Sequence, residues 1–98
     1  MDNWEFRAYI KIYERVVKDK NSDYFKLYQE LIKPLISEIY PDEIDAEKKW
    51  KYKMSSSVGS SLNRNPLFEK RRVCGCVEYK ISKEKLIESL KGKRFYQQ

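Results

Sequence analysis

The side chains best suited to binding a partner are concentrated between positions 48 and 72. Lysine and arginine neutralise phosphate groups, whereas serine, asparagine and tyrosine exchange hydrogen bonds with polar groups. The candidate contact residues are Lys48, Lys49, Lys51, Tyr52, Lys53, Ser56, Ser60, Asn63, Arg64, Lys70, Arg71 and Arg72. These residue types suit the binding of a polyanion better than they suit catalysis.

The sequence offers little chemistry for an enzyme. It has no histidine, no G-x-x-x-x-G-K-[ST] phosphate loop and no G-x-S-x-G nucleophile motif. An acidic cluster could suggest a metal nuclease, but acids at a helix N-terminus are already explained by the helix dipole. That cluster consists of Asp42, Glu43, Asp45 and Glu47. We therefore expect no catalytic residue and no cofactor.

Two cysteines, Cys74 and Cys76, flank Gly75. A pair so close in sequence cannot join distant segments through a disulfide. Without histidine or a third thiol, a zinc site is not expected. A local redox pair is the alternative to two reduced thiols beside a turn, and the pattern favours the thiols.

Positive charge is unevenly distributed along the chain. Residues 1–45 carry 7 Lys and Arg against 10 Asp and Glu, whereas residues 46–98 carry 14 against 5. The C-terminal part therefore has a net charge of +9 and the N-terminal part of −3. This asymmetry favours a polyanion bound on the C-terminal side, with an ordinary lysine-rich solvated surface as the alternative.

Length and composition indicate one small domain. The chain has 98 residues, 41% hydrophobic and 37% charged. No apolar run approaches the roughly 20 residues of a membrane span. The first five residues, Met-Asp-Asn-Trp-Glu, are acidic and unlike a secretory signal. We expect a cytoplasmic protein without a membrane partner, in the host cytoplasm if the protein is viral.

The N-terminal part, residues 1–44, is predicted to be a helical scaffold. Apolar residues at helical spacing predict a first helix over 4–18, with Phe6, Tyr9, Ile10, Tyr13, Val16 and Val17 on its inner face. Asp2 matches a capping position for this helix. Ser22 is a candidate cap for the second helix. Pro34 is expected either to break or kink that helix near Lys33 or to begin a separate short one.

A long helix is predicted from the cap residue Asp45 to about Arg64. A stripe that recurs every four residues should be buried, and it comprises Ala46, Trp50, Met54, Val58 and Leu62. At about 100° per residue, the opposite face holds Lys49, Tyr52, Ser56, Gly59, Ser60 and Asn63. Small residues on this face allow close approach either of another helix or of DNA.

A β-hairpin and a last helix complete the predicted elements. The dipeptide Asn65-Pro66 should end the long helix, and strands are expected over 67–73 and 76–81 with a turn at Cys74-Gly75. Ser82 should cap a helix with Leu86, Ile87 and Leu90 as its apolar stripe, Gly92 just beyond its end and a basic tail over 93–98. The predicted fold is mostly α with a small antiparallel β-hairpin.

Residues 45–82 resemble the winged-helix family of DNA-binding domains. The resemblance rests on the run from Val58 to Lys70, V-G-S-S-L-N-R-N-P-L-F-E-K, and on Tyr79-Lys80-Ile81, which look like the passage from recognition helix to wing in HARE-type and forkhead-like members. It implies one domain over 1–98: a helical scaffold (1–44), a recognition helix and wing (45–82), and a C-terminal helix with its tail (83–98). This chain departs from the family in its short wing and its additional or extended N-terminal helix.

The resemblance implies that the long helix enters the major groove of double-stranded DNA. Serine and asparagine would then contact base edges, with Asn63 suited to adenine, while the lysines and arginines contact phosphates. A small microbial (for example archaeal) or viral transcriptional regulator is the expected function, and such proteins often dimerise. Either the first or the last helix could supply that dimer interface. The rival hypothesis is an interaction module, such as a viral inhibitor of a host protein, that binds protein through the same helix face.

Overall fold

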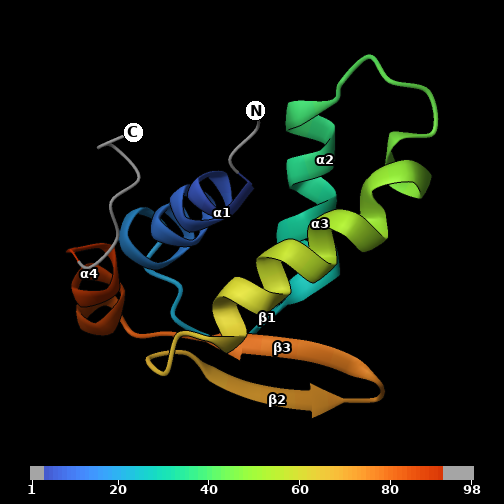
Figure 1. The fold of residues 1–98 in the computed structure, drawn as a ribbon. Helices are drawn as coiled ribbons and strands as arrows, with labels where there is room; N and C mark the ends of the chain where they lie inside the picture. Colours follow the sequence, from blue (N-terminus) through green and yellow to red (C-terminus); the bar gives the residue numbers. More distant parts are fainter. Residues whose placement is uncertain (1–3, 92–98) are drawn as a thin grey trace.

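The computed structural model describes residues 4–91, which form helices above one face of a small sheet (Figure 1). The elements, in chain order, are α1 (Trp4–Tyr13), the π-helix η1 (Glu14–Lys18), β1 (Phe25–Lys26), the π-helix η2 (Leu27–Ile32), α2 (Lys33–Ile39), α3 (Ala46–Asn63), β2 (Glu69–Val73), β3 (Cys76–Lys80) and α4 (Lys83–Lys91). The described part is thus mostly helical, as predicted.

The sheet has three antiparallel strands in the order β1-β3-β2. The predicted hairpin is present, and β1 adds a strand on the other side of β3, where Phe25 pairs with Tyr79. Within the hairpin, Lys70 pairs with Tyr79 and Arg72 with Val77. Because directly paired residues of neighbouring strands point to the same face, this register assigns a face to every cation of the hairpin.

The first helix is present, but its buried face differs from the predicted one. Helical structure runs continuously from α1 into η1, where the Asp19 amide donates to the Glu14 carbonyl at 2.9 Å, and so ends at Lys18 as expected. The buried residues of α1 are Ala8, Tyr9 and Ile12, whereas Phe6 and Ile10 are partly exposed. The expected cap Asp2 lies outside the described residues.

The predicted second helix is present, but the prediction that Ser22 caps it was wrong. Phe25 and Lys26 form β1, and the helix begins only at Leu27. The Phe25 ring is buried against Tyr79, with 6.3 Å between ring centres. Arg15 fixes the approach to this strand because its Nη2 donates to the Tyr24 carbonyl at 3.3 Å. Tertiary contacts therefore outweigh the local helical pattern.

Pro34 does not break the helix. Lys33 keeps helical dihedrals of −59° and −47°, and the chain passes directly from η2 into α2. Pro34 occupies the first turn of α2, directly after the π-helix η2. Neither a break nor a separate short helix is therefore present, because η2 and α2 are continuous.

Helix α3 matches its predicted length and buried stripe. Met54, Val58 and Leu62 are fully buried, and Trp50 is half-buried with its ring stacked on Tyr40 at 4.5 Å. Asp45 precedes the helix in the left-handed conformation, with φ of 56°, and makes no capping hydrogen bond through its side chain. Asp45 therefore stands at the predicted N-cap position, but its side chain does not cap the helix.

The hairpin turn and the last helix follow their sequence signals. Cys74 and Gly75 form the turn with φ of 51° and 80°, the left-handed values that a two-residue hairpin turn requires. The Ser82 hydroxyl accepts a hydrogen bond from the Lys85 amide at 3.3 Å and so caps α4. Leu86 is fully buried, so the described structure assigns it to the core rather than to a dimer interface. Gly92 and the basic tail lie outside the described residues.

None of the helices in residues 4–91 is both long enough and apolar enough to span a membrane.

Candidate nucleic-acid interface

Helix α3 carries an exposed polar face opposite its buried stripe. The predicted contact residues are all exposed on the surface of the described chain. Those on the side of α3 away from the core form what we call the polar face: Lys49, Tyr52, Lys53, Ser56, Ser60, Asn63 and Arg64. Ser57, which the sequence analysis omitted, is also exposed beside them. The polar face thus presents short hydrogen-bonding side chains between cations.

Gly59 does not belong to the polar face, contrary to the sequence prediction. It is buried, and a Cβ placed on it would lie 3.3 Å from Cδ2 of Leu27 in η2. Its small size therefore lets η2 approach α3. Of the two reasons proposed for small residues on this helix, close packing of another helix applies to Gly59.

Lys49 is engaged by two neighbouring side chains, Glu43 and Trp50. Lys49 Nζ lies 3.0 Å from Glu43 Oε1, while the other oxygen of Glu43 accepts a hydrogen bond from Trp50 Nε1 at 2.8 Å. The hydrogen bonds from Trp50 and then from Lys49 lower the pKa of Glu43. Glu43 thus has a structural role, and the N-terminal end of the polar face is partly neutralised.

Lys51 points toward η2 rather than along the polar face. Its Nζ lies 4.6 Å from the ring centre of Tyr28. The Tyr28 hydroxyl is itself buried, and burial together with the carboxylate of Glu47 raises the pKa of Tyr28 to about 12. Lys51 therefore stands at the border of the surface that α3 presents.

The three cations of the hairpin fall on two different faces of the sheet. Lys70 and Arg72 are paired with Tyr79 and Val77, the two β3 residues that point toward the helices. Arg71 is paired with Glu78 on the opposite face. Because β2 is an edge strand, Lys70 and Arg72 remain exposed although they lie on the same face of the sheet as Tyr79. We call these two residues the hairpin cations.

Arg71 is held by two neighbours on the outer face of the sheet. Its Nε donates to Glu78 Oε1 at 2.7 Å, and its guanidinium carbon lies 3.9 Å from the ring centre of Tyr24. Glu78 is nearly buried although its side chain lies on the face of the sheet opposite Tyr79. Arg71 therefore compensates a carboxylate within the fold.

A buried tyrosine joins the hairpin to the polar face. Tyr79 is 1% exposed, and its hydroxyl donates to Asn63 Oδ1 at 2.8 Å. Burial raises the pKa of Tyr79, and the nearby charge of Arg72 opposes that rise without reversing it. Tyr79 was not among the predicted site residues. The alternation of apolar and polar residues along β3 is consistent with a buried ring at this position, but it gives no sign that the hydroxyl reaches Asn63.

Asn65 fixes the junction between α3 and the hairpin. Its Nδ2 donates to the Tyr9 hydroxyl at 3.0 Å and to Ser89 Oγ at 2.6 Å, while its Oδ1 accepts from the Leu67 amide at 3.0 Å. One side chain thereby connects α1, α4 and the start of the hairpin. The direction in which the hairpin leaves α3 depends on this asparagine.

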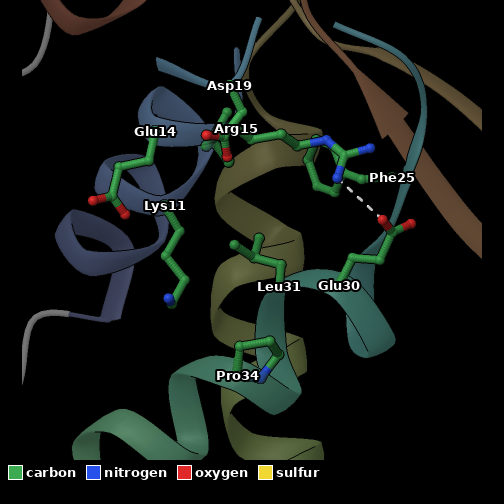
Figure 2. A pocket seen from close by; sticks show the side chains of 9 residues that line it. Lys11, Glu14, Arg15, Asp19, Phe25, Glu30, Leu31 and Pro34 are labelled. Atoms are coloured by element: carbon green, nitrogen blue, oxygen red, sulfur yellow. Dashed lines mark hydrogen bonds and ion pairs between the residues drawn. The ribbon is translucent and has the colours of Figure 1, made fainter. Parts of the chain in front are cut away.

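A concave surface lies between α1, η1 and η2, and its two cations, Lys11 and Arg15, have carboxylate partners. Figure 2 shows Arg15 reaching past Phe25 to Glu30, with 3.1 Å between Nη1 and Oε1. Lys11, on the same wall, pairs with Glu38. The hollow has a volume of about 280 Å³. Since its principal cations already have carboxylate partners, it is a weaker candidate for a polyanion than the polar face.

The thiols of Cys74 and Cys76 are both free and exposed at the tip of the hairpin. Across residues 4–91, no group of three or more cysteine and acidic side chains is arranged to hold a metal ion.

Comparisons with known proteins assign no family to the chain. No protein-family model, no curated protein and no solved structure matches it.

Proposed function

We propose that this chain is a winged-helix protein that binds double-stranded DNA through the polar face of α3 and the hairpin cations. In this proposal α3 enters the major groove, which admits one α-helix, and the hairpin lies over the adjacent backbone. Its role would be that of a small transcriptional regulator.

The arrangement of elements supports the winged-helix part of the proposal. Helix α3 packs on α2, and a β-hairpin follows α3 directly, which is the layout expected of a recognition helix and its wing. The polar face and the hairpin cations adjoin each other because Tyr79 contacts Asn63 from the strand that pairs with β2. A duplex bound against α3 would therefore meet the hairpin as well.

The observation that carries the proposal is the chemistry of this combined surface. The side chains at its centre are short: Ser56, Ser60 and Asn63. They can form hydrogen bonds while still allowing a partner to approach the helix closely. The surrounding cations Lys53, Arg64, Lys70 and Arg72 form no ion pair within the part of the chain that the structure describes. Uncompensated charge around a polar strip favours a phosphate backbone over an apolar partner.

The test is a gel-shift titration of the purified chain with random duplex DNA over a salt series. The variant Lys70→Glu/Arg72→Glu removes the hairpin cations. Its control is Lys83→Glu/Lys85→Glu, which makes the same charge change on exposed residues of α4. Log K should fall by about 0.9 per phosphate contact for each tenfold rise in salt. The hairpin variant should therefore bind more weakly, with a slope shallower by about 2, whereas the control keeps most of the slope.

Two results would contradict the proposal. Absence of duplex binding even at low salt would exclude DNA as the partner. Equal losses in the hairpin and α4 variants would show that only the net charge matters, and would remove the hairpin from the interface.

A protein-binding module remains the second candidate because of Tyr52. This side chain is 79% exposed at the edge of the polar face, and tyrosine is enriched at protein interfaces. Binding of that kind would depend weakly on salt, and the substitution Tyr52→Ala would weaken it strongly.

A homodimer remains a prediction of the DNA-binding hypothesis, since two copies would read two half-sites. Light scattering of the purified protein as it elutes from a size-exclusion column measures its oligomeric state directly.

A further inference from the structure

The hydroxyl of the buried residue Tyr79 orients the exposed side chain of Asn63 on α3. The Tyr79 ring packs between Phe25 and Phe68, with 6.3 Å between ring centres in each case. Such packing leaves the ring a single position. Asn63 is exposed at the last turn of α3, where a side-chain amide without a partner would rotate. The hydrogen bond of 2.8 Å to Oδ1 removes that freedom.

The direction of this hydrogen bond follows from the surroundings of the phenol. Burial raises the pKa of Tyr79, so the hydroxyl keeps its proton at neutral pH. The nearby guanidinium of Arg72 has only donors, and it therefore favours the orientation in which the phenol oxygen faces Arg72 and the phenol proton faces Asn63. An amide that receives this proton must do so through Oδ1. Its Nδ2 group is then the end that turns toward a partner.

On the basis of the proposed function, we infer that Tyr79 is a positioning residue that makes Asn63 a hydrogen-bond donor in the DNA groove and thereby disfavours cytosine at one base position. Guanine presents N7 and O6 as acceptors in the major groove, adenine presents N7 and thymine presents O4. Cytosine presents its N4 amino group, a donor, which would oppose the Nδ2 donor. Discrimination against cytosine is therefore the signature of an oriented Asn63.

The test is selection of bound sequences from a pool of random duplexes, followed by affinity measurements on the selected site and on its variant with cytosine at the contacted position. The wild type should prefer the selected base over cytosine by about tenfold, the scale of one good base contact. Asn63→Ala should remove the preference. Tyr79→Phe, which deletes only the hydroxyl, should reduce it to less than about threefold, and the double variant should behave like Asn63→Ala. The salt slope should be unchanged in all three, because no phosphate contact is lost.

Tyr9→Phe is the matched control for the loss of a buried hydroxyl. Tyr9 is also 1% exposed, and its hydroxyl accepts a hydrogen bond from an asparagine, Asn65, away from the polar face. This variant should lose stability without losing the discrimination against cytosine. Retention of full preference by Tyr79→Phe, or its equal loss in Tyr9→Phe, would overturn the role of Tyr79.

A second variant keeps the test independent of whether Tyr79→Phe folds well. Asn63→Asp preserves an acceptor for Tyr79 but turns an acceptor instead of a donor toward the DNA. It should therefore shift the preference at the same position toward cytosine, whose N4 group donates to carboxylates. Unchanged discrimination against cytosine would overturn the inference. Duplex binding without any base preference in the wild type would also overturn it while leaving DNA binding intact, whereas absence of duplex binding is failure of the proposed function itself.

Discussion

The guanidinium carbon of Arg71 lies 3.9 Å from the centre of the Tyr24 ring, on the face of the sheet opposite α3. The same guanidinium donates to Glu78, whose side chain is almost inaccessible to solvent. These contacts separate Arg71 from Lys70 and Arg72, its neighbours in sequence. The separation leads to different expectations for the three cations.

Arg71→Ala should lower the free energy of unfolding by about 1–2 kcal/mol, because it leaves the Glu78 carboxylate without its donor. In a Glu78→Gln background the same substitution should cost less, since no buried charge is then left unpaired. Urea unfolding of the two single variants and the double variant measures this coupling. Equal costs in both backgrounds would mean that the hydrogen bond does not contribute to stability.

Asn65→Ala should be among the most destabilising substitutions of a polar side chain in the described part of the chain. It removes the donor to Tyr9 and Ser89 and the acceptor for the Leu67 amide, and a loss of about 2–3 kcal/mol is expected. Asn21→Ala is the matched control, because Asn21 accepts a single hydrogen bond from the Asp23 amide in an exposed loop. Thermal or urea unfolding should show little change in that control. Similar losses at both positions would contradict a special role of Asn65.

Gly59→Ala separates helix packing from DNA contact. Alanine gains up to about 1 kcal/mol of helix propensity, and its Cβ requires only that the Leu27 methyl group, 3.3 Å away, shift slightly. We expect a small net gain in stability and unchanged DNA affinity. Gly59→Leu should instead destabilise by about 1–3 kcal/mol through overpacking. Weaker DNA binding by Gly59→Ala at unchanged stability would show that Gly59 takes part in the DNA contact.

Stability in acid should depend on Glu43. Its pKa is lowered below the ordinary value of 4.5 by hydrogen bonds from Trp50 and Lys49. A carboxyl with a lowered folded-state pKa stabilises the fold above its unfolded pKa, and this contribution is lost as the pH falls through the folded pKa. Urea unfolding from pH 6 to pH 3 should therefore show a difference between wild type and Glu43→Gln that shrinks below about pH 4.5. A constant difference over this range would contradict the assignment.

The strongest local signals in the sequence predicted the elements that present the candidate site. The four-residue stripe from Trp50 to Leu62 defined α3, and Asn65-Pro66 ended it before the hairpin. Neighbouring residues in a strand point to opposite faces of the sheet. The predicted strand therefore already implied that Arg71 and Arg72 lie on different faces. Grouping the three hairpin cations together disregarded that alternation.

Other features depend on contacts between residues far apart in sequence. The strand β1 has only two residues, and they lie in a segment with helical periodicity, so its formation depends on Tyr79 as partner. Gly59 lies at the edge of the polar face, where a helical wheel cannot show whether Leu27 covers it. The contact between Tyr79 and Asn63 likewise requires the docking of β3 against α3.

The central position of β3 also sets an order for folding. Its partner β2 is joined to it by the two-residue turn Cys74-Gly75, so this pairing closes a minimal loop and forms within about 1–10 μs in hairpins. Its other partner, Phe25, precedes Tyr79 by more than fifty residues, and closing that loop requires much of the helical layer to be in place. The β1–β3 bridge is therefore a late step of folding, and its loss should mainly accelerate unfolding rather than slow folding.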